Sequence, residues 1–554
     1  MALLLLLGAA LRVNHLNDKS LWLDEFYAIA HATGHLIDPS ALAYRHQPVT
    51  PEAPKIASFY VDQSFAMPDG FQPEKTLAVL KTNVHTPLFF MALSGWMHLG
   101  QALGVNPLSP GWLRIPSLGF GLLAILLMGL IAWQLSRGRL HRGAITFTAA
   151  AMMTLSGYFV YHSQNARPYT MLICWALLAV LGLLQAQHRP KQGVTLMTAS
   201  LIAALYTSYW AAPFVLWILG FAWFTQVVPR FWLVVSSAVL GLAFAPWLPI
   251  LMQQRAFTHI SGHYTDGLFN PVQLPEQLWR TLCSFVMIKA SWFRIVMLVL
   301  AFAMAGCGWI KQKVDGFTMR QWPLWLKLCA SWLMSLLVSH ILADIMGQSH
   351  TATIQRYLVL AAPPWLLLIA FGLWQTPWEV ILYRLRPSTF FKRWGSGILV
   401  GLLLTAMFTS AWRVSEGKAF KSEAFKDMAG ILKTEGHPGE DLVLIHKPGA
   451  PVAGLAYYLG NVSAAAGTNT ASQLLLRSFN EKTPLAQDSL AAVMIWLDHH
   501  PEIQRLWWVQ THSGDVIYQS VQPVLLAHHF ESVTPINTHL EGFRFQRFER
   551  KKHR

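Results

Sequence analysis

Charged residues make up only 12% of this 554-residue chain. Soluble proteins usually carry about 25%, so roughly half of the expected charge is missing. This shortage argues against a soluble multidomain enzyme, a disordered chain and a coiled coil. Cysteine is also scarce: the four cysteines lie in or beside apolar segments, at spacings that do not suit metal ligands. A disulfide framework and a zinc ribbon are therefore not expected.

Hydrophobic residues, in contrast, make up 54% of the chain. A spanning helix needs about 20 mostly apolar residues. The apolar run at residues 2–13 is shorter than this. Because no small-residue cleavage site follows it, we expect a first spanning helix rather than a signal peptide. Further candidate spans lie at 86–103, 113–135, 144–162, 169–186, 194–209, 211–228, 231–251, 291–310, 323–346, 357–374 and 396–413. The pattern predicts an α-helical polytopic membrane protein with about 11–13 transmembrane helices, over residues 1–414.

Two polar regions interrupt the apolar pattern. Residues 14–84 carry five Lys/Arg and eight Asp/Glu, a net charge of −3, and are expected to form an extracytoplasmic catalytic loop. Residues 415–554 are long enough for a small domain. Strand-like runs at 441–445 and 505–510, with helical patterns at 421–434 and 486–498, predict a C-terminal α/β domain.

Basic residues outnumber acidic ones 42 to 27, which gives a formal charge of +15. In an apolar chain this excess marks cytoplasmic loops, so it calls for no nucleic-acid partner. Short basic loops at 137–142, 189–191, 311–320 and 384–393 place the C-terminal domain outside the cytoplasmic membrane. One conflict arises: three apolar segments separate loop 14–84 from the polar stretch 163–167, so simple alternation puts these two regions on opposite faces.

Polar groups beside membrane segments are the informative residues in such a chain. Trp22, Asp24 and Glu25 follow the first helix. The two carboxylates suit a general base with a partner that orients the acceptor or binds a metal. The same residues also suit the N-cap of a helix over 26–32, and spacing alone leaves both interpretations open.

Three further positions suit an anionic ligand. His85 opens a helix, where the helix dipole favours negative charge, and a simple helix-start signal with an aromatic belt is the alternative interpretation. Arg167 and Arg356 can bind phosphate in bidentate fashion, or they can be interfacial anchors. His259, His263 and Asp266 are a weak metal hypothesis, because Gly262 disfavours the helix that would align them.

Taken together and in order, these segments resemble the GT-C superfamily of polytopic glycosyltransferases. They are most similar to bacterial relatives of the dolichyl-phosphate-mannose protein mannosyltransferases, glycosyltransferase family 39. The segments that carry the resemblance are Leu11-Arg12, Ser20-Leu21-Trp22-Leu23-Asp24-Glu25, His85-Thr86-Pro87-Leu88-Phe89-Phe90, Leu113-Arg114-Ile115-Pro116-Ser117, Ser163-Gln164-Asn165-Ala166-Arg167-Pro168-Tyr169, and Arg356-Tyr357-Leu358 with Pro363-Pro364.

The resemblance implies an inverting transfer of a sugar from a polyprenyl-phosphate donor to a lipid, glycan or protein acceptor. Asp24 would be the base and Glu25 would assist it. Arg167 and Arg356 would stabilise the leaving phosphate, with His85 as a further contact. The remaining substrate-lining residues would be Trp22, Gln164, Asn165, Tyr169 and Tyr357. A divalent metal stays open as a cofactor, because Asn165 replaces the family's acidic residue.

Three other classes of protein remain open at this point. A transporter or flippase of lipid-linked glycans would show internal repeats and charges at the bilayer midplane. An O-antigen polymerase or ligase would favour arginines in a large external loop. A structural or sensory membrane protein is a further alternative. The external acidic loop and the external domain favour catalysis at the outer face of the cytoplasmic membrane.

Overall fold

The computed structural model describes residues 1–35, 67–258, 270–287, 322–375 apart from 348 and 350, 389–417, 424–437, 440–446, 454–459 apart from 456, 475–479, 497–511, 515–536 and 543–551. The chain divides into two compact units. Unit 1 consists of Met1–Leu16, Leu80–Phe89 and Arg114–Ala419. Unit 2 consists of Asn17–Val79, Phe90–Leu113 and Phe420–Arg554. The expected boundary at 414 and 415 lies close to one of these divisions, but unit 2 also takes in two earlier segments.

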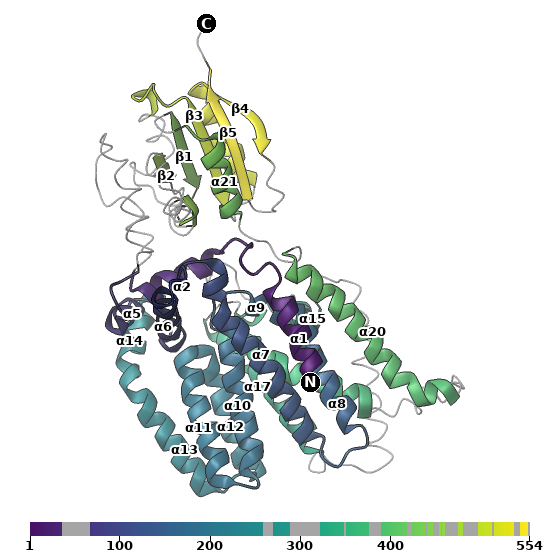
Figure 1. The fold of residues 1–554 in the computed structure, drawn as a ribbon. Coiled ribbons are helices and arrows are strands. Elements are labelled where there is room, and N and C mark those ends of the chain that lie inside the picture. The colour runs from purple at the N-terminus through teal and green to yellow at the C-terminus, as the bar shows by residue number, and fades with distance from the viewer. Residues whose placement is uncertain are drawn as a thin grey trace. The chain divides into compact units, whose positions relative to one another are not determined.

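Unit 1 is built from packed helices (Figure 1). Its described elements are α1 (Ala2–Val13), most of α7 (Pro110–Leu135), α8 (Arg142–Leu155), α9 (Gly157–Ser163), α10 (Tyr169–Ala186), α11 (Pro190–Thr207), η1 (Tyr209–Ala211), α12 (Ala212–Thr225), α13 (Arg230–Phe244), η2 (Ala245–Trp247), α14 (Leu248–Thr258), α15 (Leu274–Val286), α17 (Leu324–Gly347), η4 (Thr351–Thr353), η5 (Val359–Ala361), α18 (Ala362–Gln375) and α20 (Thr389–Ser415). Helix α10 packs on α11, α12 on α17, and α20 on α8 and α9. Helix α10 is buried on nearly all sides, which explains its lack of a polar face.

Five stretches of the described chain are long and apolar enough to cross a membrane. They are Pro110–Leu135, Tyr169–Ala186, Arg230–Arg255, Leu324–Gly347 and Trp394–Ser415. Helices α8 and α9 together form a sixth, bent by 55°. Shorter apolar helices cover Ala2–Val13, Tyr209–Thr225 and Val359–Gln375. These helices confirm the polytopic α-helical fold, while the predicted span at 291–310 lies outside the described residues.

The predicted span at 86–103 is a shorter element. Helix α6 (Leu88–Ala102) has 15 residues. At 1.5 Å per residue it is about 22 Å long, which is less than the hydrocarbon thickness of about 30 Å. Trp96 and Trp112 stack at 4.5 Å between ring centroids, and each indole nitrogen donates to the other residue's carbonyl. This pair fixes α6 against the first turn of α7.

Unit 2 also contains α2 (Leu23–Thr33), α5 (Pro73–Leu80) and a C-terminal α/β part. The latter comprises α21 (Phe425–Glu435), β1 (Asp441–His446), β2 (Leu475–Phe479), β3 (Arg505–Thr511), α24 (Asp515–Ala527), β4 (Phe530–Ile536) and β5 (Phe543–Arg550). The strand order is β2-β1-β3-β5-β4, with β1 parallel to β2 and β3, and β5 antiparallel to β3 and β4. Residues 442–445 and 506–509 are all buried, so both faces of the central strands are covered.

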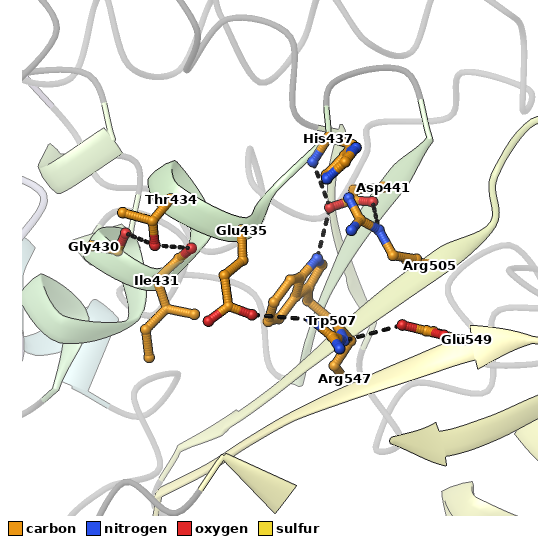
Figure 2. Close-up of polar contacts among 10 residues, drawn as sticks. All are labelled: Gly430, Ile431, Thr434, Glu435, His437, Asp441, Arg505, Trp507, Arg547 and Glu549. Carbon is orange, nitrogen blue, oxygen red and sulfur yellow. Dashed lines mark hydrogen bonds and ion pairs between the residues drawn. The ribbon is translucent and has the colours of Figure 1, made fainter. Parts of the chain in front are cut away.

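The predicted strands and the first predicted helix of the tail are therefore confirmed, and most of the predicted helix at 486–498 lies outside the described residues. Asp441 begins β1 with no exposed surface. Its carboxylate accepts from Arg505 Nε at 2.7 Å, Trp507 Nε1 at 2.8 Å and the His437 amide at 2.9 Å (Figure 2). A buried carboxylate is stable only with such partners. Asp441 therefore ties β1 to β3 as a structural residue.

Candidate active site

The acidic pair lies at the first turn of α2, in unit 2. Glu25 is fully buried, and its Oε2 accepts a hydrogen bond from the Trp22 amide at 3.2 Å. It thereby satisfies a backbone donor at the helix start and places a negative charge at the positive end of the dipole. Asp24 is only half-buried. Burial, and then the negative charge of Asp24, raise the pKa of Tyr27. The two carboxylates thus occupy different environments.

The C-terminal part of the chain holds this helix within unit 2. Phe26 is fully buried, and its ring contacts those of Phe425, Tyr457 and Tyr458 at centroid distances of 5.9, 5.4 and 6.4 Å. The Leu21 amide donates to the Tyr458 hydroxyl at 2.6 Å. The acid-bearing segment is therefore packed on residues about 400 positions or more away, which no local pattern indicates.

The basic residues form a second group, in unit 1. Both Arg167 and Arg356 exert their positive charge on His85. Desolvation, followed by these two charges, lowers the pKa of His85 to about 3. The imidazole is therefore neutral at physiological pH, so the group offers two fixed positive charges and one neutral ring. Such a set suits an anion more than a metal ion.

The backbone at His85 is held by a residue that local sequence patterns do not reveal. Gln254 is buried, and its Nε2 donates to the carbonyls of Leu80 at 2.6 Å and His85 at 3.1 Å. The Tyr209 hydroxyl donates to the Gln254 side-chain oxygen, and Trp247 Nε1 donates to that hydroxyl at 2.6 Å. This chain of hydrogen bonds fixes the turn that carries His85.

Arg167 lies in the short turn between α9 and α10. Its guanidinium is 5.8 Å from the centroid of the Tyr169 ring, within cation–π range. Ser117 Oγ donates to the Arg167 carbonyl at 3.2 Å, and Thr170 Oγ1 donates to the Ser117 carbonyl at 2.9 Å. Two motifs of the family resemblance, separated by some 50 residues, thus meet in one turn.

The side-chain amides of Gln164 and Asn165 stabilise this turn by donating hydrogen bonds to backbone carbonyls. Gln164 Nε2 donates to the carbonyls of Leu11, Arg12 and Asn14, at 3.3, 3.2 and 2.9 Å. Asn165 Nδ2 donates to the Tyr161 carbonyl at 2.9 Å. Both side chains are buried. Their amide groups therefore contribute to the local structure, whatever their oxygens do towards a substrate.

Arg356 and Tyr357 follow η4. The Arg356 guanidinium is 5.4 Å from the Tyr357 ring, which stacks on Trp210 at 4.7 Å. The turn before them is anchored by the buried Asp344, whose carboxylate accepts from Ser349 Oγ, from the amide and Oγ1 of Thr351, and from the Ala352 amide at 2.6–2.7 Å. Asp344 is the only acidic residue in the apolar run 324–347. A single carboxylate in such a run is a sequence feature by which its structural role could have been predicted.

Arg12 is another structural residue whose role depends on distant partners. It is fully buried and donates to the carbonyls of Met153 and Thr154 at 3.2 Å and to Ser163 Oγ at 3.1 Å. The break between α8 and α9 leaves carbonyls of the last α8 turn without helical partners. Arg12 satisfies two of them and links the break to the turn of Arg167.

The described residues include no group of three His, Cys, Asp or Glu side chains placed to hold a metal ion. The weak metal hypothesis at 259–266 falls outside the described part of the chain. Asp24 and Glu25 belong to unit 2, whereas His85, Arg167 and Arg356 belong to unit 1.

Known proteins resemble this chain in fold rather than in sequence. Neither the family models nor the curated protein sequences give a significant match. Solved structures do match: the crystal structures of ArnT from Cupriavidus metallidurans, in the apo state and bound to undecaprenyl phosphate, each superpose with a TM-score of 0.51. In both cases the match covers 99% of this chain and 97% of ArnT, at 11% sequence identity.

The chain has the GT-C fold. ArnT is a GT-C glycosyltransferase, and the match covers 99% of this chain. At 11% identity the likeness is one of fold. It agrees with the fold that the sequence resemblance implies, whereas membership of the superfamily and of family 39 stays a prediction.

Proposed function

We propose that this protein is an inverting glycosyltransferase of the cytoplasmic membrane. It transfers a sugar from a polyprenyl-phosphate donor to a lipid, glycan or protein acceptor at the outer face. The observation that carries the proposal is the joint action of Arg167 and Arg356 on His85 in a chain with the GT-C fold. The structure of ArnT with undecaprenyl phosphate supports a polyprenyl phosphate as the lipid of the donor.

Asp24 is proposed as the general base. It removes the proton of the acceptor hydroxyl or amine while the acceptor attacks the anomeric carbon from the face opposite the leaving group. The bond between that carbon and the phosphate oxygen breaks, and its electrons remain on the phosphate. Glu25 is proposed to position Asp24, because its carboxylate caps the helix that carries both residues.

Arg167 and Arg356 are proposed to bind the phosphate and to stabilise the charge that it gains as the bond breaks. The neutral His85 adds a polar contact without a third positive charge. These steps are assigned to side chains of the protein, and a divalent metal stays open as a cofactor. Tyr169 and Tyr357 hold the two guanidinium groups through their ring faces.

The length of α6 supports placing these groups on one side of the membrane. If α6 does not cross, only α7 and the bent α8–α9 pair separate loop 14–84 from residues 163–167. An even number of crossings returns the chain to the same face, which removes the conflict that simple alternation of spans creates. Unit 2 supports the same arrangement, because it joins residues 17–79 with residues 420–554.

The experiment is a product-release assay. The purified protein is incubated with polyprenyl-phosphate sugars and acceptor extracts, and free polyprenyl phosphate is measured by mass spectrometry. Wild type is expected to release it, and Asp24→Asn to slow release about 100-fold or more. Asp18→Asn is the matched control, because Asp18 is an exposed carboxylate six residues away. Equal activity of Asp24→Asn and wild type overturns the assignment of the base.

The same assay tests the finer assignments. A panel of mannose, glucose, galactose and aminopentose donors identifies the sugar, and family 39 membership predicts a preference for mannose. Movement of an intact lipid-linked glycan across vesicles, with no release of polyprenyl phosphate, would instead identify a flippase. Release that depends on a diphosphate-linked donor would identify a polymerase-like enzyme. Addition of EDTA tests the dependence on a divalent metal.

A further inference from the structure

A second buried histidine lies beside the two arginines. His162 is part of α9, after the break that Arg12 stabilises, and only 4% of its surface is exposed. Its ring meets those of Tyr158 and Tyr169 edge to face, at centroid distances of 4.4 and 4.7 Å. The imidazole is thus fixed in orientation between two tyrosines, all within unit 1.

Each of these tyrosines contacts one arginine or the residue next to it. The guanidinium carbon of Arg167 lies 5.8 Å from the centroid of the Tyr169 ring. The hydroxyl of Tyr158 donates to the carbonyl of Gln355 at 2.9 Å, directly before Arg356. His162 therefore lies near both cationic side chains, whose charges contribute to its electrostatic environment.

One ring nitrogen of His162 has no hydrogen-bond partner among the described residues. The buried Nδ1 of His162 makes no hydrogen bond to any of them. A buried polar atom without a partner costs about 1–3 kcal/mol, so native proteins rarely retain one without a reason. A bound anion between Arg167 and Arg356 would supply an acceptor and remove this cost.

We propose that His162 contacts the donor phosphate and donates its Nδ1–H to a phosphoryl oxygen. This inference rests on the proposed function. As the glycosidic bond breaks, the phosphate changes from a diester with one negative charge to a monoester that gains a second. A fixed donor that is already desolvated stabilises this added charge without reorganisation. This hydrogen bond thus adds to the positive charges of the two arginines.

Substitutions distinguish this role from packing. The amide nitrogen of Asn can replace Nδ1, that of Gln can replace Nε2, and Phe keeps the ring without any donor. Binding of undecaprenyl phosphate to the full chain in detergent is measured by native mass spectrometry. We expect His162→Asn to bind within about threefold of wild type, and His162→Gln and His162→Phe to bind about tenfold or more weakly.

The controls separate the outcomes. His188→Asn, at an exposed position paired with Arg137, is expected to bind like wild type. Melting temperatures identify the variants that fold. His162→Phe retains an aromatic ring, so it preserves the edge-to-face packing even if His162→Asn and His162→Gln lose it. Equal binding by wild type and a folded His162→Phe overturns this inference alone, as does equal weakening by Asn and Gln. Failure of wild type to bind the lipid phosphate overturns the proposed donor as well.

Discussion

Among single residues, neighbours in the sequence take different roles because their environments differ. Asp24 and Glu25 are adjacent, yet Glu25 is fully buried and caps α2 while Asp24 keeps contact with solvent. From sequence, the capping and the catalytic interpretation compete for the pair. In the structure the cap belongs to Glu25, and the proposed catalytic role belongs to Asp24.

This division predicts separable effects of substitution. Glu25→Ala removes the acceptor of the Trp22 amide and should destabilise the protein by about 1 kcal/mol. Glu25→Gln keeps an acceptor oxygen, so it should retain most of the stability and most of the product release. Thermal denaturation and the release assay check both. Loss of release in a stable Glu25→Gln variant would instead indicate that Glu25 takes part in the proton transfer.

His85 gives a prediction for pH dependence. Its pKa in the folded protein is about 3, and the ordinary value is 6.5, so between these values the unfolded chain binds the additional proton. Stability should therefore fall as pH decreases from about 6.5 towards 3, because the native state resists protonation. His85→Gln should weaken this dependence. Melting temperatures measured between about pH 7 and pH 4.5 in detergent test it, and identical slopes for both proteins would contradict it.

Among the helices, the break between α8 and α9 is the feature that places the Arg167 turn. Three separate segments meet there: Arg12 of α1, Ser163 of α9, and α7 at Gly121. A Cβ built on Gly121 would lie 2.9 Å from Ser163 Cβ and 3.3 Å from Arg12 Nε, and closer still to Ser163 Oγ. The absence of a side chain at Gly121 is therefore required for this packing.

Gly121→Ala should destabilise the protein by about 1–3 kcal/mol, since a methyl group is forced into a packed contact. It should also reduce activity by displacing the Arg167 turn. Gly119→Ala is the matched control: it lies on the same helix, a Cβ built there has no atom within 4 Å, and the substitution gains helix propensity. Melting temperatures and product release should separate the two variants, and equal behaviour would show that α9 adjusts.

Across the whole molecule, unit 2 combines three segments that are distant in the chain. The C-terminal α/β part packs on the acid-bearing helix through Phe26, Phe425 and Tyr458. The tail was predicted as a separate domain because its composition differs from that of the apolar helices. The contacts of Phe425 and Tyr458 with Phe26 show that this part of the chain also supports α2.

This arrangement predicts that damage to the tail is transmitted to α2. Phe425→Leu should increase hydrogen exchange over residues 17–33, because it weakens the aromatic cluster around Phe26. Phe530→Leu lies in the core of the C-terminal sheet and is the control. At comparable loss of melting temperature, it should leave residues 17–33 less affected. Equal exchange there in both variants would indicate that the unit opens only as a whole.

Local patterns in the chain were sufficient to predict the membrane class, most of the apolar helices, and the strands β1 and β3. The residues expected to carry the chemistry stay a prediction. Apolar runs and strand alternation are visible without a fold, because each depends only on near neighbours. Contacts between distant segments could be established only by folding. They place Arg12 on carbonyls some 140 residues away, give Gln164 three backbone acceptors, and bring Arg167 and Arg356 to act on one histidine. The fold also decides where α6 begins and ends, because helix length depends on where the chain turns.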